Sequence, residues 1–266
     1  MREPVPFTFG IALTPRANAR DWRVVERLLE LTLASVAAQT DRDFRVLIAG
    51  HERPRLSADR RIRFERMAWP VQPPGPYNAD SGRKKHWIND AVLAEGGGLL
   101  MLLDADDWVD RHTVEVARAS LTGDAVGGVI RTGWAVDYQG LIAAPLPNPR
   151  IFGGDFHRVC GSSTVARLRP GLDDPVRRDP FSVLCSHHQW DEVAAEHDAR
   201  LVDLPVPAAY LVNTHENHSD LHGLHADWRR GFTAAVTREG RPLDPALAAR
   251  FGLTVAAVRG KALSPT

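Results

Sequence analysis

The sequence predicts an α/β fold with a mixed sheet, parallel in its first half and flanked by helices. Short apolar runs that suit buried strands alternate with segments whose apolar residues recur every three or four positions, as in amphipathic helices. The expected order is strand, helix, strand, strand, helix, strand, helix, which is typical of a parallel sheet covered by helices. With 266 residues, the chain can build one large domain around a buried core.

The first strand and the first helix carry the clearest patterns. Residues 7–13 form a mostly apolar run that predicts a strand, and Thr14-Pro15 ends it. Asp21 is placed to cap a helix. The apolar positions of this helix have helical spacing: Trp22, Val25, Leu28, Leu29, Leu33 and Val36.

Two more strands are expected before the second helix. Residues 44–49 form a compact apolar run that Gly50 halts, and Ile62, Phe64 and Met67 indicate the next strand. The proline-rich segment 69–76 must then be a loop, because proline lacks the N–H that regular structure needs.

The second helix is expected over about residues 83–94, with Gly96-Gly97-Gly98 after its end. Residues 99–103 are all apolar and predict a strand buried on both faces. Asp110 is then expected to cap a third helix that runs to about Leu121.

The remaining elements are less regular. Strands are expected over 126–130 and 134–138, a loop over 145–149, and a helix that Ser186 caps and that carries Trp190. Further strands follow near 200–204 and 208–212, and the pattern is helical from Ala226 onward. We therefore expect two units, a main domain over residues 1–225 and a helical C-terminal extension over 226–266 packed on it.

Composition excludes several classes of protein. Thirty-three basic residues balance thirty-three acidic ones, so no nucleic-acid partner is expected. The longest apolar run has five residues, far short of the roughly 20 needed to cross a bilayer, and the N-terminus lacks a secretory signal. Cys160 and Cys185 are too few for a disulfide framework. The prediction is a soluble cytoplasmic protein without a transmembrane segment.

The segment that carries chemistry follows the buried strand at 99–103. Asp104, Asp106 and Asp107 come directly after it, where the strand reaches the carboxyl edge of the sheet. Ligands of open α/β sheets bind at this edge. Clustered carboxylates repel one another unless a cation neutralises them, and a hard divalent cation prefers oxygen ligands. The pattern therefore predicts a divalent metal site completed by a diphosphate.

The chain resembles a known family in this region. The Asp104-Ala105-Asp106 motif followed by Trp108-Val109-Asp110 looks like that of nucleotide-sugar glycosyltransferases of the GT-A fold, especially family 2. Residues 33–40 and 43–48 are similar to the first helix and second strand of that family. Residues 28–44 look closest to a bacterial group described as rhamnosyltransferases. The resemblance covers roughly residues 7 to 220.

The resemblance implies a Mn²⁺ or Mg²⁺ ion bound against the diphosphate of a nucleotide-sugar donor. Asp106 is the expected direct ligand, with Asp104 nearer the ribose or a water on the metal. Seven of the eleven histidines lie between 187 and 225. The family places a histidine near the metal or diphosphate in this part of the chain, which points to His215 first and to His218 second.

The resemblance also implies which residues bind the donor nucleotide. Thr14 and Arg16 follow the first strand, and Arg83, Lys84 and Asn89 match the region that contacts base or phosphate. If a helix begins at Arg83-Lys84-Lys85, its free backbone N–H groups and these cations would both favour a bound diphosphate.

The sequence departs from the family at two places. Residues 49–52 (Ala-Gly-His-Glu) stand where the family has an aspartate that reads the base. Where the family has an acidic pair that includes the general base, this sequence has residues 187–192. In this stretch, either Asp191 or His188 could deprotonate an acceptor hydroxyl. Gly161 and Ser162 are candidates for backbone that lines the pocket.

The expected activity is metal-dependent transfer of a sugar from a nucleotide diphosphate to a hydroxyl acceptor, in a single inverting displacement. The acceptor could be a saccharide, a lipid-linked sugar or a small molecule, and a retaining outcome stays open. The alternative is a metal-dependent hydrolase that uses the carboxylates with the histidine-rich region and Zn²⁺. A third reading takes residues 244–261 as a helix-turn-helix DNA reader, which the neutral charge disfavours.

Overall fold

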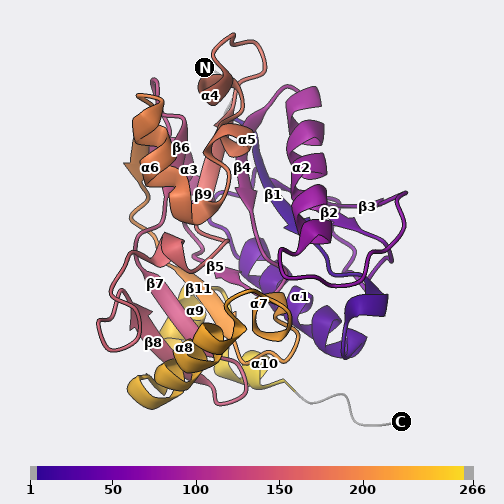
Figure 1. Ribbon diagram of the computed structural model, residues 1–266, viewed down its shortest axis with the longest axis vertical. Coiled ribbons are helices and arrows are strands. Elements are labelled where there is room, and N and C mark those ends of the chain that lie inside the picture. Colours follow the sequence, from indigo (N-terminus) through magenta and orange to yellow (C-terminus); the bar gives the residue numbers. More distant parts are fainter. Residues whose placement is uncertain (1–4, 261–266) are drawn as a thin grey trace.

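The computed structural model describes residues 5–260 and contains two sheets with helices packed on them (Figure 1). The larger sheet has seven strands in the spatial order β10 (Leu201–Asp203), β6 (Gly127–Val129), β9 (Thr164–Leu168), β4 (Gly98–Leu102), β1 (Phe7–Ala12), β2 (Arg45–Gly50) and β3 (Ile62–Arg66). The smaller sheet has the order β12 (Arg241–Pro242), β8 (Ile142–Leu146), β7 (Gly133–Asp137), β11 (Ala208–Val212) and β5 (Trp108–Val109).

The predicted fold class is confirmed by the strand pairing. β1 pairs in parallel with both β2 and β4, and β2 pairs in parallel with β3. β9 is antiparallel to its neighbours β4 and β6, so the sheet is mixed beyond its first half. The carboxyl ends of β1, β2 and β4 consequently meet at one edge of the sheet.

Helices cover both faces of the larger sheet because its strands are apolar on both sides. α2 (Ala79–Ala94) lies across β1, β2 and β4 on one face (Figure 1). Gly10 permits this approach, since a Cβ there would lie 2.6 Å from Ile88 Cγ2. On the other face, Phe9 and Ile11 pack with buried residues of α1 (Trp22–Ala37) and α3 (Thr113–Ser120).

The first helix forms as predicted. The Asp21 carboxylate accepts a hydrogen bond from the backbone N–H of Arg23 at 2.9 Å, and this satisfies one free donor at the start of α1. Val25, Leu29 and Val36 are buried along its inner face.

The second helix begins earlier than predicted. It starts at Ala79 rather than Arg83, with Asn78 at its N-cap position in the left-handed conformation and without a side-chain cap. The Asp80 carboxylate lies in the first turn, where it suits the positive end of the helix dipole. Arg83, Lys84 and Lys85 therefore do not open the helix, and the free N–H groups belong to the residues before them.

The predicted caps at Asp110 and Ser186 are wrong. α3 starts at Thr113, and Asp110 accepts a hydrogen bond from the His112 N–H while its other oxygen pairs with Arg250 at 2.6 Å. The Ser186 hydroxyl bonds to His188 Nδ1 instead of the backbone, and a 3₁₀ turn, η3 (His187–Gln189), precedes α6 (Trp190–Glu196). Ser186 is thus taken by a local side chain, whereas Asp110 is taken by a local backbone N–H and by a distant arginine.

Two strands differ from the prediction. The expected loop at 145–149 overlaps β8, which includes Pro145. Proline is tolerated there because β12 pairs only with Ile142 and Ala143, so Pro145 needs no N–H on that side. The central strand β9 was not predicted, because its sequence (Thr-Val-Ala-Arg-Leu) contains too short an apolar run.

The C-terminal part is helical from Ala226, as predicted, and it packs on the smaller sheet and α1. α8 lies on β7 and β8 (Figure 1), and Phe251 packs with Trp108, their ring centroids 6.0 Å apart. The division into 1–225 and 226–266 stays a prediction, and residues 261–266 of that extension lie outside the described residues. The helices of this part are α8 (Ala226–Glu239), α9 (Pro245–Arg250) and α10 (Val255–Arg259).

Several short helices and turns connect these elements. Among the described helices, none has the length and apolar character to span a bilayer. The short elements are η1 (Arg16–Asn18), η2 (Phe156–Arg158), α4 (Pro175–Arg178), α5 (Pro180–Leu184) and α7 (His218–Leu221).

Phe251→Ala tests whether the C-terminal helices belong to the core. The Phe251 side chain is fully buried, so its removal leaves a cavity and should lower the free energy of unfolding by about 3–5 kcal/mol. The exposed Arg259→Ala in the same part should change it by less than about 0.5 kcal/mol. Urea unfolding followed by circular dichroism measures both; equal effects would show that the helices do not share the core.

Candidate active site

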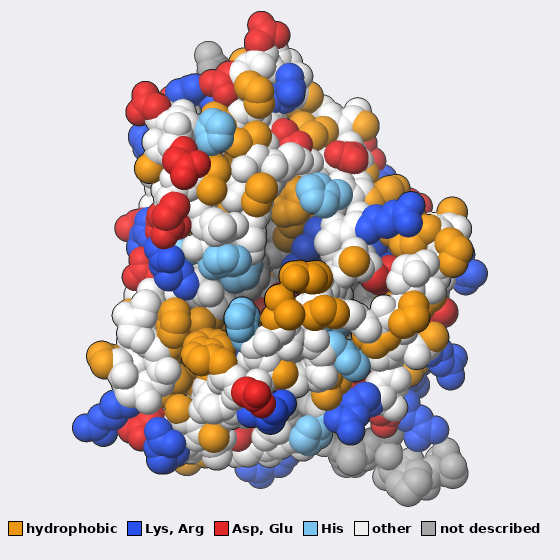
Figure 2. Space-filling model, in the orientation of Figure 1, with side chains coloured by type: hydrophobic (Ala, Val, Ile, Leu, Met, Phe, Trp, Pro, Cys, Tyr) orange, Lys and Arg blue, Asp and Glu red, His pale blue; other side chains and the backbone are white. Residues whose placement is uncertain are grey.

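A cavity of about 250 Å³ opens at the carboxyl edge of the larger sheet, between the ends of β1 and β4. The face of the molecule in Figure 2 is hollowed near its centre. β1 lies between β2 and β4 in the sheet. The chain continues from β1 to β2 and β3 on one side, and then crosses to β4 on the other side. This reversal of strand order is where open α/β sheets bind nucleotides. Thr14 lines the cavity from β1, and Asp104 and Asp106 line it from β4.

Asp104 is held by contacts from two other elements. Its carboxylate accepts a hydrogen bond from Lys85 Nζ of α2 at 2.8 Å, and its backbone N–H donates to Ser162 Oγ at 2.9 Å. Burial raises the pKa of Asp104, but the Lys85 ammonium outweighs burial and holds the pKa below its usual value. Asp104 is therefore ionised at neutral pH and partly neutralised.

Asp106 has no such partner. Within residues 5–260, no other residue forms a hydrogen bond or an ion pair with its carboxylate, which has only its own backbone N–H beside it and lines the cavity. Burial, with the nearby charges of Asp107 and Asp104, raises its pKa well above the usual value. A cation in the cavity would remove this penalty.

Asp107 points away from the cavity into the core, so the expectation of three carboxylates around one ion is corrected to two. Asp107 Oδ1 accepts from the Leu211 N–H at 3.0 Å, and Oδ2 accepts from Ser162 Oγ at 2.6 Å. The Cys160 thiol lies 3.5 Å from the same Oδ2. Burial and the Asp104 charge raise the pKa of Asp107 to about 7. Its role is to tie β11 and residue 162 to the loop that carries Asp104 and Asp106.

Arg83, Lys84 and Asn89 do not line the cavity, although the resemblance assigned them to the donor. The Arg83 guanidinium lies 4.2 Å from the centroid of the Trp69 ring. Lys84 Nζ is buried and donates to the Leu13 carbonyl at 2.7 Å and to Asp80. Asn89 is buried on the inner face of α2, and its side-chain amide donates to Asp179 Oδ2 at 3.0 Å.

The cations that do line the cavity are Lys85, which the sequence offered only as the last residue of the basic run 83–85, and Arg229, which was not predicted. Lys85 lies on the same face of α2 as Ser81, four residues earlier, which also lines the cavity. The four-residue spacing alone does not single out Lys85, since Asp80 and Lys84 have it too. Arg229 Nη1 donates to the Tyr210 hydroxyl at 2.9 Å, and nothing in its local sequence marks it.

One end of the cavity is formed by the end of β1 and the start of α2. Thr14 lines it as predicted, whereas Arg16 is exposed in η1 and its N–H donates to Glu52 at 3.0 Å. The acidic side chain that the family has at the end of β2 is absent. Asp80 of α2 lies at this end instead and pairs with His51 at 3.0 Å.

The two candidate histidines of the 213–222 segment lie in different hollows. His215 has a positive φ of 64° and lines a neighbouring hollow with Arg20 and Asp220. His218 lines the main cavity, where its Nε2 lies 2.7 Å from the Gly75 carbonyl and burial lowers its pKa. Of the two, only His218, the second choice, therefore lines the main cavity.

The predicted bases lie beside the cavity but do not line it. Asp191 accepts two hydrogen bonds from Arg131, each 2.9 Å long, and these hold its pKa below the usual value. His188 Nδ1 lies 2.8 Å from Ser186 Oγ. The neighbouring His187, which was not singled out from the sequence, does line the cavity.

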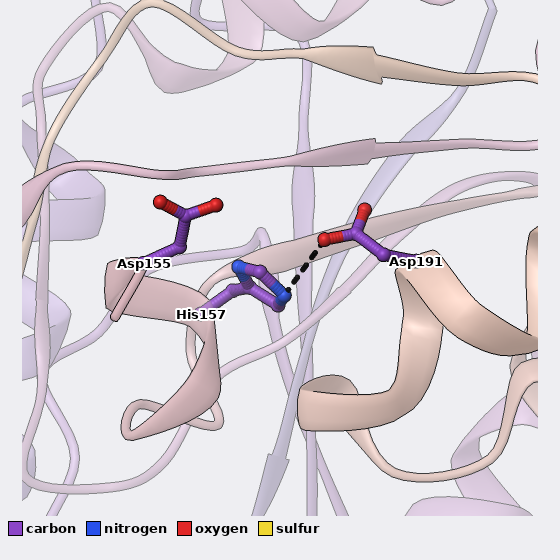
Figure 3. Close-up of side chains that lie close together, drawn as sticks. All are labelled: Asp155, His157 and Asp191. Carbon is purple, nitrogen blue, oxygen red and sulfur yellow. Dashed lines mark ion pairs between the residues drawn. The ribbon is translucent and has the colours of Figure 1, made fainter. Parts of the chain in front are cut away.

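Asp191 belongs to a second group that has the ligand types of a metal site. One ligand atom each of Asp155, His157 and Asp191 lies within 4.8 Å of the others (Figure 3). Arg131 already supplies a cation to it, since Nη1 lies 2.9 Å from both Asp155 and Asp191. His157 is fully buried, and its Nε2 lies 3.3 Å from Asp191 Oδ2. We interpret this group as an ion-pair network.

No protein-family model and no curated protein matches the chain. Among solved structures, the chain is similar to the galactosyltransferase LgtC in complex with donor and acceptor sugar analogues, with 11% identity over 92% of this chain and 99% of that chain and a TM-score of 0.38. It is also similar to an active-site mutant of LgtC, with 15% identity over 71% of this chain and 65% of that chain and a TM-score of 0.34. Likenesses this distant assign no activity, and the proposed function rests on the cavity itself.

Asp107→Asn tests the buried carboxylate through the pH dependence of stability. Because the folded-state pKa of Asp107 is raised from 3.8 to about 7, the folded protein keeps a proton that the unfolded chain has lost in this window. The stabilisation that comes from this bound proton is present at pH 4 and is lost as the pH rises through 7. Asn keeps the oxygen that accepts from Leu211 and removes the charge.

The free energy of unfolding of the wild type, relative to that of Asp107→Asn, should fall by about 2–4 kcal/mol between pH 4 and pH 8. Asp227→Asn, at a side chain that is 95% exposed, serves as the control. A pH-independent difference between wild type and Asp107→Asn would show that Asp107 stays ionised in the fold.

Proposed function

We propose that the chain is a metal-dependent glycosyltransferase of the GT-A fold, which moves a sugar from a nucleotide diphosphate to a hydroxyl acceptor. One observation carries the proposal. The unpartnered carboxylate of Asp106 lies beside Asp104 in a cavity at the point where the strand order reverses. Open α/β sheets bind nucleotides at this position, and the two neighbouring carboxylates there favour a bound cation.

The residues present fit a hard divalent ion. Asp104 and Asp106 offer only oxygen ligands, and Mg²⁺ or Mn²⁺ is commonly held by one or two carboxylates with substrate phosphates and water completing the shell. A bound ion would supply charge that stabilises the departing diphosphate. His218 lies on the same cavity wall, whereas His215 lines the neighbouring hollow.

The chain's own cations would stabilise the same leaving group. Lys85 and Arg229 line the cavity on either side of the carboxylates, from α2 and α8. Fixed cations aimed at the oxygens where charge develops lower the barrier without reorganisation during the reaction. Lys85 is already positioned by its hydrogen bond to Asp104.

The two ends of the cavity suit the two halves of the donor. Thr14, Asp80 and Ser81 lie toward β1 and α2, where the N–H groups at the start of the helix face a nucleotide. Gly161 and His187 lie at the opposite end, beyond β4, and would contact the sugar and the acceptor. The bond between sugar and diphosphate would thus lie near Asp104.

The donor sugar and the stereochemistry belong to the proposal as well. The similarity of residues 28–44 to rhamnosyltransferases places a rhamnosyl nucleotide among the donors to be tested first. An attack from the Gly161 side on the face of the sugar opposite the diphosphate would invert the anomeric centre. The proposed acceptor is a hydroxyl of a saccharide, a lipid-linked sugar or a small molecule.

The alternative of a zinc-dependent hydrolase is less well supported. It needs a carboxylate and histidine cluster free to bind metal, and the group formed by Asp155, His157 and Asp191 is already paired with Arg131. Zinc bound there would have to displace a guanidinium held by charge-assisted hydrogen bonds.

Asp106→Asn tests the proposed metal and donor site. In the presence of Mn²⁺, at least one donor from a panel of UDP-, GDP- and dTDP-sugars that includes dTDP-rhamnose should raise the melting temperature of the wild type. At a donor concentration of 100 times Kd, binding should add about 2.7 kcal/mol to the free energy of unfolding. Asp106→Asn should lose this shift. Without ligand, the variant should be at least as stable as the wild type, because it lacks the uncompensated charge.

Asp227→Asn, which alters an exposed carboxylate of α8, should respond as the wild type does. A Mn²⁺-dependent shift that persists in Asp106→Asn would contradict the site, as would a wild type that responds to no donor in the panel.

A further inference from the structure

His187 is the histidine that the fold brings closest to the proposed reaction centre from the acceptor side. It is the first residue of η3 and lines the cavity next to Gly161. A Cβ at Gly161 would lie 2.8 Å from Asp104 Oδ2 and 3.8 Å from His187 Cδ2. The absence of a side chain at Gly161 thus leaves the imidazole and the carboxylate on either side of this residue, both lining the same cavity.

The contacts of the ring fix its tautomer. His187 Nδ1 is hydrogen-bonded to the backbone carbonyl of His157. A carbonyl oxygen can only accept, so Nδ1 carries the hydrogen and Nε2 keeps its lone pair. In the described part of the chain, no donor occupies Nε2.

The ring is also uncharged where it lies. Burial lowers the pKa of His187 to about 4, so the imidazole is neutral at pH 7 and its lone pair is available. The Asp104 carboxylate opposes this shift. The Lys85 ammonium lowers the pKa further, so the ring stays neutral until the acceptor proton reaches it.

We propose that Nε2 of His187 is the general base that deprotonates the acceptor hydroxyl. The inference rests on the proposed glycosyltransferase function. The acceptor oxygen forms its bond to the anomeric carbon while its proton passes to Nε2. The bond from that carbon to the diphosphate oxygen breaks, and the electron pair leaves with the nucleoside diphosphate. The proton is released from the imidazolium after the product departs.

Asp191 then has a positioning role rather than that of the base. Arg131 holds both of its oxygens, and Asp155 and Asp203 pair with the same guanidinium. Asp191 Oδ2 lies 3.3 Å from Nε2 of the buried His157 (Figure 3). The network thereby lies against the residue whose carbonyl accepts from His187, although no hydrogen bond between described residues reaches the His157 ring itself.

The tautomer can be measured without substrate. In protein labelled with ¹⁵N-histidine, a long-range ¹H–¹⁵N spectrum at pH 7 should show His187 with Nδ1 protonated and Nε2 unprotonated. The loss of these signals in His187→Asn assigns them. A His187 protonated on Nε2, or on both nitrogens, would overturn the proposal.

The catalytic role is tested with the donor and acceptor for which the wild type releases nucleoside diphosphate. His187→Asn places an amide near the Nδ1 position, so it can keep the hydrogen bond to His157 while it removes the base. Its kcat should fall at least about 100-fold, with the melting shift by Mn²⁺ and donor unchanged. His197→Asn, exposed at the end of α6, is the matched control and should keep its activity.

The outcomes separate the two proposals. A His187→Asn enzyme with kcat within threefold of wild type overturns the assignment of the base and leaves the donor site intact. Loss of the Mn²⁺-dependent shift in His187→Asn also overturns it, since His187 would then act in metal or donor binding. A wild type that binds no nucleotide sugar overturns both proposals.

Discussion

The functional interpretation depends on one electrostatic constraint, the negative charge that β4 delivers into a partly closed cavity. Asp104 is neutralised by Lys85 and Asp107 is satisfied inside the core, whereas Asp106 has no partner in residues 5–260. A partly buried carboxylate without an ionic partner destabilises the fold. The unpaired carboxylate is explained if a cation and its phosphate ligand bind to it during function. The parallel strands, the open end of α2 and the cations at the rim are all arranged around that charge.

The elements that position this charge were predictable because each rests on a local pattern. Apolar runs define β1 and β4, helical spacing with a capping aspartate defines α1, and the acids after β4 mark the sheet edge. The burial of Asp107 was not predictable from the sequence. Its partners, Leu211 and Ser162, lie 104 and 55 residues away, and only the fold brings them together.

The basic and acid–base groups of the site were harder to predict for the same reason. In the run 83–85, the direction of each side chain depends on where α2 starts, and a start at Ala79 turns Lys84 inward and Lys85 toward the cavity. Among residues 187–191, the 3₁₀ turn presents His187 to the cavity, and Arg131 holds Asp191 away from it. Composition and spacing identified the right segments, and tertiary contacts chose the residues within them.

Anomalous diffraction from crystals soaked with Mn²⁺ and a nucleoside diphosphate tests the central claim most directly. Data collected at the manganese absorption edge locate the ion independently of any assumed reaction. The account predicts one strong peak within coordination distance of the Asp106 carboxylate, beside Asp104, with the diphosphate in the same cavity. A peak between Asp155, His157 and Asp191 with the Asp106 side empty would contradict it.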